Sequence, residues 1–294
     1  MTLHLPAPLS ASQWCNEQRL LQKSIGYVPT MGALHPGHLS LIEQAQREND
    51  VCCVSIFVNP LQFNDPDDLI GYPSNLDNDI RLLESAGCHM VYTGTLGEFF
   101  PEVEDIHQID SCDPGPAAKG LEGNYRPGHL QGVYQIVERL FTTVGDCRAY
   151  FGEKDFQQTL VVKNLAEKMQ QTGTNVEVIV CPTVREPSGL AMSSRNTKLG
   201  DAHSCTAALI YKALGKAKSA WQQGIRVAEK LEDIMLDTLQ HPDLKVEYAA
   251  VRDPNGWTEN SPDYPLKQAQ ALIAAHLGGV RLIDNLCLSD DLLE

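Results

Sequence analysis

Two histidines, His35 and His38, have the spacing in this sequence that is most suggestive of chemistry. They flank Pro36 and Gly37, where an apolar run gives way to an amphipathic pattern typical of a helix. The first N–H groups of a helix have no partner within it, so a helix start readily binds phosphate. Imidazoles there can donate hydrogen bonds to a phosphate whose charge grows in a transition state. We predict that this turn holds the phosphates of ATP, although an isolated H-x-G-H could also be an ordinary loop.

A second candidate is Gly152-Glu-Lys-Asp155, which also lies where a predicted strand meets a predicted helix. Lys154 could neutralise a phosphate, and Asp155 could accept hydrogen bonds from ribose hydroxyls. The same residues could equally form a solvated first turn of a helix, where an acidic side chain is favourable.

Two further segments could bring cations to the site. Met192-Ser-Ser-Arg195 places a guanidinium, the bidentate reader of phosphate, in a segment rich in turn residues that could close over a triphosphate. Arg126-Pro-Gly-His129 could present another cation to an acidic substrate. The alternatives are a serine N-cap for the first segment and a helix start for the second.

Three glutamines suit a small hydroxy acid whose orientation must be fixed by hydrogen bonds. These are Gln62, which follows a predicted strand, and the adjacent Gln157 and Gln158. Surface glutamines are the alternative. The sequence offers no cysteine pair with metal-ligand spacing and no nucleophile beside a general base. Catalysis by positioning and charge needs neither, so this pattern favours chemistry at a phosphate.

The elements that must position these residues alternate regularly in the first half of the chain. Apolar runs predict strands over 24–28, 51–58 and 90–92, with Pro29 ending the first. One predicted helix opens near Pro36, and another follows the capping pattern Ser74-x-x-Asp77. Strand and helix alternation of this kind predicts an α/β fold with a Rossmann-like, doubly wound parallel sheet.

The later elements suggest a second, smaller domain. After a long loop over 94–127, with one strand expected over 106–109, we predict a helix over 133–144 and strands over 148–151 and 176–180. Beyond about residue 196 the pattern changes to helices and strands of an α+β unit. We therefore place a Rossmann-like domain that binds the nucleotide and the acid at 1–186 and a C-terminal α+β domain at 187–294.

Charge and composition exclude several classes of function. The net charge of −15 over 294 residues disfavours binding to nucleic acid or to an anionic membrane. Nine cysteines without a framework indicate reduced thiols. The first ten residues lack the pattern of a signal peptide, and no apolar run reaches the length of a membrane span. We expect a cytoplasmic protein with small-molecule substrates, no nucleic acid and no membrane.

Six segments together resemble the pantothenate synthetase (pantoate–β-alanine ligase) family, a group within the HxGH nucleotidyltransferase superfamily. They occur in the family's order between residues 25 and 200. The segments are Pro29-Thr-Met-Gly-Ala-Leu-His-Pro-Gly-His38, Phe57-Val-Asn-Pro-Leu-Gln-Phe63, Tyr72-Pro73 with Asp77 and Asp79, Leu121-Glu-Gly-Asn-Tyr-Arg-Pro-Gly-His129, Tyr150-Phe-Gly-Glu-Lys-Asp-Phe-Gln-Gln158 and Met192-Ser-Ser-Arg-Asn196.

This resemblance implies an ATP-dependent ligase of pantothenate biosynthesis that acts as a homodimer and binds pantoate in its first domain. In the family reaction, the carboxylate of (R)-pantoate attacks the α-phosphate of Mg²⁺-ATP to give pantoyl adenylate and pyrophosphate. The amine of β-alanine then displaces AMP to give pantothenate. The cofactors implied are ATP, as a substrate, and Mg²⁺, whose ligands the sequence does not identify.

The resemblance also implies roles for individual residues. His38 and His35, with Lys154 and Arg195, would carry the catalytic charge. Gln62 would contact both pantoate and β-alanine, and Gln158 would contact pantoate. The implied ATP-binding residues are Met31, Gly32, Ala33, Leu34, His35, Pro36, Gly37, His38, Gly152, Glu153, Lys154, Asp155, Val184, Met192, Ser193, Ser194 and Arg195.

Two positions depart from the family pattern. Ser74 stands where an arginine is frequent, and Pro36 stands where an acidic residue is common. Three alternatives remain at this level. The chain could be another HxGH-type adenylyltransferase acting on a different small acid, an aminoacyl-tRNA synthetase, which the charge disfavours, or a nucleotide-sensing module without activity.

Overall fold

The computed structural model describes residues 1–103, 109, 112–200 and 203–289. The chain forms two compact units. The first unit comprises Met1–Ala118, Arg126–Gly152 and Gln157–Pro182, and the second comprises Lys119–Tyr125, Glu153–Phe156 and the chain from Thr183. The predicted boundary between residues 186 and 187 stays a prediction, and the two short earlier segments show that the units interleave along the sequence. Most of the strand expected over 106–109 lies outside the described residues.

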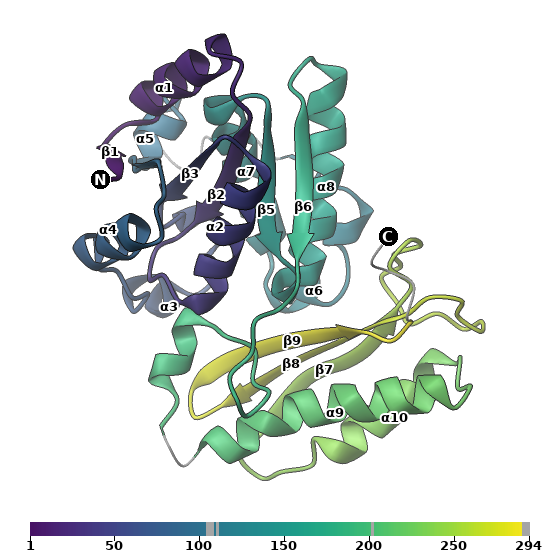
Figure 1. Cartoon of the computed structure of the whole chain (residues 1–294). Coiled ribbons are helices and arrows are strands. Elements are labelled where there is room, and N and C mark those ends of the chain that lie inside the picture. The colour runs from purple at the N-terminus through teal and green to yellow at the C-terminus, as the bar shows by residue number, and fades with distance from the viewer. Residues whose placement is uncertain (104–108, 110–111, 201–202, 290–294) are drawn as a thin grey trace. The chain divides into compact units, whose positions relative to one another are not determined.

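A six-stranded parallel sheet forms the centre of the first unit (Figure 1). Its strand order is β1-β4-β3-β2-β5-β6, with every neighbouring pair parallel. The predicted doubly wound sheet is thus confirmed, and only β1 was not predicted, because three residues carry no periodic signal. The strands are β1 (Leu3–Leu5), β2 (Ile25–Thr30), β3 (Val51–Ile56), β4 (Met90–Tyr92), β5 (Cys147–Gly152) and β6 (Val176–Cys181).

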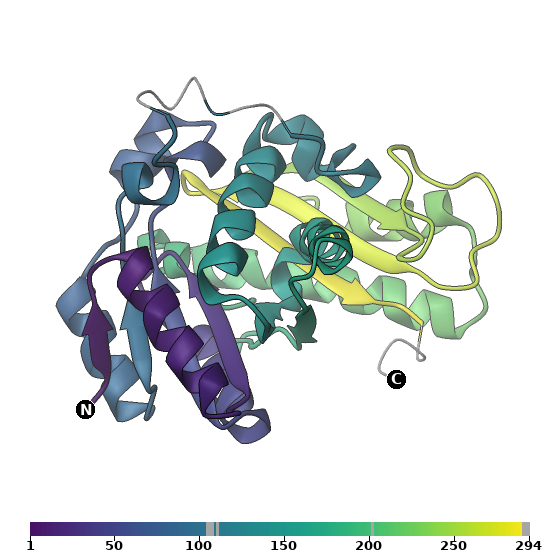
Figure 2. The same ribbon diagram turned by 90° about the horizontal axis from the view of Figure 1, so that it is seen from above.

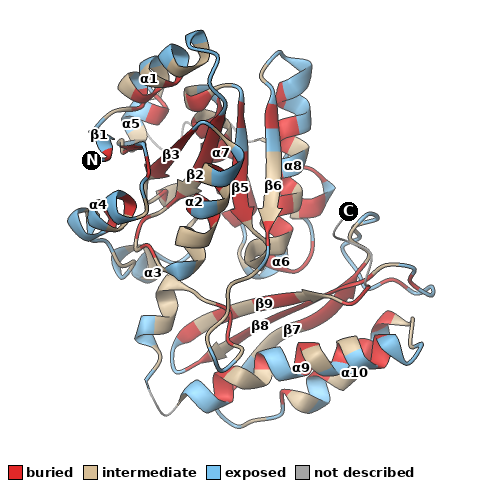
Figure 3. Cartoon of the chain, in the orientation of Figure 1, coloured by how far each residue is buried: buried red, intermediate tan, exposed pale blue. Residues whose placement is uncertain are grey.

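Helices cover both faces of this sheet (Figures 1 and 2). Val28 of β2 packs in one cluster with Leu41 and Ile42 of α2, whereas Phe151 of β5 meets Phe141 of α7. The central strands β2 and β3 are buried over most of their length, as Figure 3 shows, which explains their continuous apolar sequences. The helices are α1 (Pro8–Leu20), α2 (Pro36–Glu48), α3 (Pro66–Ile70), α4 (Leu76–Ser85), α5 (Leu96–Phe99), α7 (His129–Val144) and α8 (Phe156–Gln171), with the 3₁₀ helices η1 (Pro60–Gln62) and η3 (Pro116–Ala118).

The strand β2 lies at the point where the strand order reverses. Its neighbours are β3 on one side and β5 on the other, and the chain winds outward from it in both directions. Ligands of open α/β sheets bind outside the carboxyl ends of the strands at such a point. The segment after β2, from Met31 to His38, therefore begins at the expected ligand edge.

Three local predictions were wrong. Pro29 does not end its strand, because β2 runs to Thr30 while its pairing with β5 stops at Tyr27, so the missing N–H costs no ladder hydrogen bond. Asn75, not Ser74, caps α4, since its side chain accepts from the N–H of Asn78. The segment 94–127 is not a plain loop: its described part also contains α5, η3 and α6 (Glu122–Tyr125), which are too short for a periodic signal.

The second unit is built on an antiparallel sheet of β7 (Lys245–Arg252), β8 (Gln270–Leu277) and β9 (Val280–Cys287). The helices α9 (Ser204–Gln222) and α10 (Ala228–Thr238) pack on one face through residues such as Ile273. The preceding residue of β8, Leu272, points to the other face and packs with Leu121 and Phe156. The segments Lys119–Tyr125 and Glu153–Phe156 thus pack on the face of the sheet that α9 and α10 leave open. Among the described residues, no helix is long and apolar enough to cross a bilayer.

Candidate active site

The turn after β2 is held by a buried carboxylate. Gly32 and Ala33 both have positive φ, at +80° and +50°. Asp79 of α4, which is 1% exposed, accepts hydrogen bonds from the N–H groups of Ala33 and Leu34 at 2.9 and 2.8 Å. A Cβ at Gly32 would lie 2.9 Å from the same carboxylate, so this position needs glycine for both its φ and its space.

The two histidines begin α2 as predicted. His35 is the N-cap, and its Nδ1 accepts from the N–H of Gly37 at 3.1 Å. The Nδ1 of His38 accepts from the N–H of His35 at 3.4 Å, and the two ring centroids lie 4.0 Å apart. Because Nδ1 is an acceptor in each ring, the proton of each neutral ring is on Nε2. Both imidazoles therefore carry an Nε2–H donor at the positive end of a helix.

Gln62 is joined to this turn within the first unit. Its Nε2 donates to the Sδ of Met31 at 3.1 Å, and its Oε1 accepts from Asn59 Nδ2 at the same distance. Asn59 is 1% exposed and also donates to the carbonyl of Gly132, so the amide of Gln62 is oriented from behind by a fixed group. The predicted substrate-binding and ATP-binding residues are thus neighbours here.

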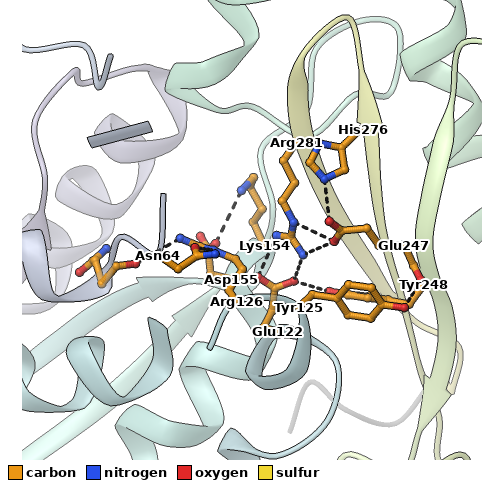
Figure 4. A network of polar contacts seen from close by, with 11 residues as sticks. Asn64, Glu122, Tyr125, Arg126, Lys154, Asp155, Glu247, Tyr248, His276 and Arg281 are labelled. Carbon is orange, nitrogen blue, oxygen red and sulfur yellow. Dashed lines mark hydrogen bonds and ion pairs between the residues drawn. The ribbon is translucent and has the colours of Figure 1, made fainter. Parts of the chain in front are cut away.

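The backbone of Gln62 is held by the segment Arg126–His129. The Gln62 carbonyl accepts from Nδ1 of His129 at 2.8 Å and from a guanidinium N–H of Arg126 at 3.3 Å. Both candidates for an acid-binding cation thus contact a glutamine predicted to bind the acid. Arg126 also donates to the Asn64 side chain (Figure 4).

The paired glutamines of α8 have different surroundings. Gln157 is buried and donates to the carbonyl of Ala117 at 2.8 Å, so its side chain joins α8 to η3. Gln158, the residue predicted to contact pantoate, is half-buried on the same helix. Gly152, the last residue of β5, also belongs to the first unit, where a Cβ would meet nothing within 4 Å.

The other predicted phosphate ligands belong to the second unit. Lys154 lies in η4 (Glu153–Asp155), and its ammonium is 3.7 Å from Asp155 (Figure 4). Burial raises the pKa of the Glu153 carboxyl, the nearby Asp284 carboxylate adds to the rise, and Arg185 opposes it. The carbonyls of Glu153 and Lys154 both accept from the side-chain amide of Asn285.

A hairpin links the remaining candidates of the second unit. The N–H of Met192 donates to the carbonyl of Val184 at 2.9 Å, and Arg185 forms a bridge with Ala191. Ser193 caps η5 (Ser194–Lys198) by accepting from the N–H of Arg195 at 3.3 Å. The serine cap and the presentation of Arg195 are therefore compatible, and Val184 and Met192–Arg195 form one connected element.

A separate ionic cluster fastens α6 to the sheet of the second unit (Figure 4). The Arg281 guanidinium contacts both oxygens of Glu122, at 2.7 and 2.9 Å, and also Glu247. Tyr248 donates to Glu122 at 2.6 Å, and His276 contacts Glu247 at 2.6 Å. Burial alone would lower the pKa of Arg281, but the two carboxylates outweigh it and raise that pKa. The cluster thus anchors the helix that immediately precedes Arg126 in the sequence.

Sequence reasoning missed the supporting residues Asp79, Asn59 and Asn285. Asp79 and Asn59 both lie in the segments that resemble the family, but nothing in the sequence assigned either of them a role. Asp79 and Asn285 bind backbone groups of residues distant in sequence, and Asn59 connects the Gln62 amide to the distant carbonyl of Gly132. No local sequence pattern reports such contacts. Among the described residues, no group of three or more His, Cys, Asp or Glu side chains could hold a metal ion.

Comparison with known proteins gives consistent matches along the chain. The family model described as Pantoate-beta-alanine ligase matches residues 6–287. The pantothenate synthetase of Herpetosiphon aurantiacus is 40% identical over 274 residues, covering 90% of this chain and 93% of that protein. The pantothenate synthetase of Cytophaga hutchinsonii is 40% identical over 273 residues, covering 92% of this chain and 94% of that protein.

Solved structures of proteins with these same names are also similar to this chain. The pantothenate synthetase of Thermus thermophilus superimposes with a TM-score of 0.86 at 36% identity, covering 98% of this chain and 99% of that one. The pantoate-beta-alanine ligase of Francisella tularensis, in complex with beta-gamma ATP and beta-alanine, superimposes with a TM-score of 0.79 at 34% identity, covering 98% of each chain.

Proposed function

This chain belongs to the pantoate-beta-alanine ligase family, and we propose how its residues carry out that ligation. The enzyme joins pantoate to β-alanine at the expense of ATP. A carboxylate oxygen of pantoate forms a bond to the α-phosphorus, and the bond from that phosphorus to the bridging oxygen breaks, releasing pyrophosphate. The β-alanine amine then attacks the acyl carbon of the adenylate. The acyl C–O bond breaks, AMP leaves, and the nitrogen loses a proton.

The observation that carries the proposal is the state of the two imidazoles. Both Nδ1 atoms accept backbone hydrogen bonds, so both rings present Nε2–H donors at the start of α2. Donors fixed in advance stabilise charge that develops on phosphate oxygens without reorganising during the reaction. We assign His38 and His35 this catalytic role. The backbone of Met31–His38, including Gly32, Ala33, Leu34, Pro36 and Gly37, would enclose the phosphates.

Two cations, Lys154 and Arg195, complete the proposed charge balance. Attack by a carboxylate on ATP joins two anions, so positive charge is required. Lys154 would neutralise phosphate as a point charge, and Arg195 would bind it through its planar fork. The remaining proposed ATP contacts come from the same segments, namely Gly152, Glu153, Asp155, Val184, Met192, Ser193 and Ser194.

The two glutamines give the proposed acid its orientation. Gln62 offers an amide that Asn59 holds and a position next to Met31, so it is suited to contact pantoate beside the α-phosphate and later β-alanine. Gln158 would bind pantoate hydroxyls from α8. Uncharged amides can fix hydroxyl groups without adding charge to an acidic substrate.

We also propose that Mg²⁺ arrives with ATP. Magnesium keeps several waters and is usually held by substrate phosphates with one or two carboxylates, not by a protein cage. The described residues fit this mode, since they include Asp155 beside Lys154 but no cluster of three metal-binding side chains. Bound Mg²⁺ would neutralise the departing pyrophosphate. By family membership we further propose a homodimer in the cytoplasm.

The test is a substrate panel. Purified protein is incubated with Mg²⁺-ATP and one acid at a time, and pyrophosphate release is followed in a single turnover before β-alanine is added. We expect release with (R)-pantoate, then pantothenate and AMP after β-alanine. Release with a different small acid, and none with pantoate, would overturn the assignment. Sedimentation in the same buffer tests the dimer.

A further inference from the structure

Asn285 of β9 links the sheet of the second unit to the segment that bears Lys154. Asn285 is 3% exposed, and the Nδ2 of its side chain donates to the carbonyls of Glu153 and Lys154 at 2.9 and 2.8 Å. Both N–H bonds of one amide group are therefore used on two consecutive peptide units.

The orientation of this amide is fixed. Peptide carbonyls only accept, so the nitrogen of Asn285 must face them. On its other side, the Oδ1 accepts from Nε2 of the fully buried Gln270 at 2.6 Å. Reversing the Asn285 amide would place its oxygen against two carbonyl oxygens, so one orientation is strongly favoured.

The neighbouring residue, Asp284, holds a second proposed ATP-binding element. Its carboxylate, whose side chain is 1% exposed, receives two hydrogen bonds from the Arg185 guanidinium at 2.6 and 3.0 Å. Arg185 also donates to the Asn285 carbonyl at 3.2 Å. Arg185 follows Val184 in the hairpin that leads to Arg195. Two adjacent residues of one strand thus hold the segments that carry the two proposed cations.

We propose that Asn285 is a positioning residue for the adenylation step. It fixes the backbone of Lys154 relative to the hairpin that presents Arg195, so that both cations meet one phosphate chain. This inference rests on the proposed function of Lys154. An apolar side chain would fill the same volume with less desolvation, whereas a fully satisfied polar group specifies a single arrangement.

The test compares Asn285→Asp and Asn285→Ser with the parent enzyme. Aspartate keeps the shape but places oxygen against the two carbonyls, and serine removes both donors without adding charge. We expect either variant to raise the KM for ATP or lower the adenylation rate by roughly 10-fold to 100-fold, since small misplacements cost this much. The KM for β-alanine should change little. Asn255→Ser, an exposed asparagine of the same unit, is the control.

A double-variant cycle separates this inference from the role of Lys154 itself. Lys154→Met removes the charge and keeps the stem. In that background, Asn285→Ser should cost less than about twofold, because the group it positions is gone. If Lys154→Met adenylates normally, the proposed role of Lys154 fails. If Lys154→Met is impaired but Asn285→Ser acts equally in both backgrounds, or only lowers stability without changing ATP kinetics, the positioning role of Asn285 is wrong. The serine variant is decisive if the aspartate variant does not fold.

Discussion

The carboxylate of Asp79 holds the backbone of Leu34, 45 residues earlier in the chain, through a hydrogen bond of 2.8 Å. The second oxygen of the same carboxylate binds the preceding N–H, at Ala33. A positive φ at Ala33 is unfavourable for a residue with a Cβ, so this turn depends on partners that fix it. Asp79 therefore shapes the loop that places His35 and His38 at the start of α2.

Replacing this carboxylate should weaken both the fold and the reaction. In Asp79→Asn, an NH₂ group replaces one of the two carboxylate oxygens and faces a backbone N–H. At least one buried donor would then lose its acceptor, at a cost of about 1–3 kcal/mol. We expect a lower free energy of unfolding in urea and a higher KM for ATP. Asp77→Asn, on an exposed position of the same helix, is the matched control. Equal ATP kinetics for the two variants would show that Asp79 does not shape the phosphate turn.

His38 has two separable roles, and two substitutions distinguish them. Its Nδ1 accepts from the N–H of His35, and its Nε2–H is the proposed phosphate donor. Asparagine places an oxygen where Nδ1 lies but has no group at the Nε2 position. We expect His38→Asn to lose adenylation by roughly 10²–10³-fold, as for removal of one oxyanion donor.

The alanine variant of the same residue serves as the comparison. His38→Ala should lose the same factor in adenylation and also about 0.5–1.5 kcal/mol of stability, because the hydrogen bond that its Nδ1 accepts from the N–H of the N-cap residue His35 is lost. Pyrophosphate release in a single turnover and urea unfolding measure the two effects. A near-normal rate in His38→Asn would exclude Nε2 as a transition-state contact.

The order of elements and the site motifs were readable from the sequence because their signals are local. Buried parallel strands such as β3 read as continuous apolar runs, and α2 shows its apolar face at helical spacing. His35 and His38 could be placed at a strand-to-helix junction for the same reason. The prediction that Pro29 ends its strand was wrong because the cost of a proline depends on whether its nitrogen faces a paired neighbouring strand. A sequence does not report which strand that nitrogen faces.

The supporting contacts could not be read in this way. Asp79 to Leu34, His129 to Gln62 and Asn285 to Lys154 each join residues that only the folded chain brings together. The sequence indicated that Arg126–His129 could serve an acidic substrate. In the structure, this segment holds the glutamine that we expect to contact the substrate.

Two helical glycines should respond oppositely to alanine. A Cβ at Gly132 of α7 would collide with the carbonyl group of Leu61 and lie 2.7 Å from the Gln62 nitrogen. We expect Gly132→Ala to cost about 1–3 kcal/mol and to raise the KM for pantoate, because the backbone that carries Gln62 must move. Gly215 of α9 has open space around it, so Gly215→Ala should stabilise by about 0.5–1 kcal/mol.

Unfolding in urea and initial rates at varied pantoate concentration measure these two effects. A Gly132→Ala enzyme with the parent's KM for pantoate would show that the spacing between α7 and η1 does not position Gln62. A loss of stability in Gly215→Ala would instead show that α9 cannot accept a methyl group there, and Gly132 would then lack its control.

The last prediction concerns pH. Burial raises the pKa of the Glu153 carboxyl above its ordinary value of 4.5. Between the unfolded and folded pKa values, the folded state holds a proton that the unfolded state has released, so stability falls as pH rises. The loss begins near pH 4.5 and is complete above the folded pKa, whereas below pH 4.5 the two states hold the same proton. At neutral pH, Glu153 therefore reduces stability.

Glu153→Gln removes this titration with little change in shape. We expect the variant to be more stable than the parent at pH 7, and we expect the difference to shrink as the pH falls from the folded pKa toward 4.5 and to stay constant below that, measured by urea unfolding at each pH. Glu259→Gln, at an exposed site of the same unit, is the matched control. A constant gain at all pH values would mean that packing, not ionisation, caused it. The trend would show that Glu153 is ionised at neutral pH at the expense of stability.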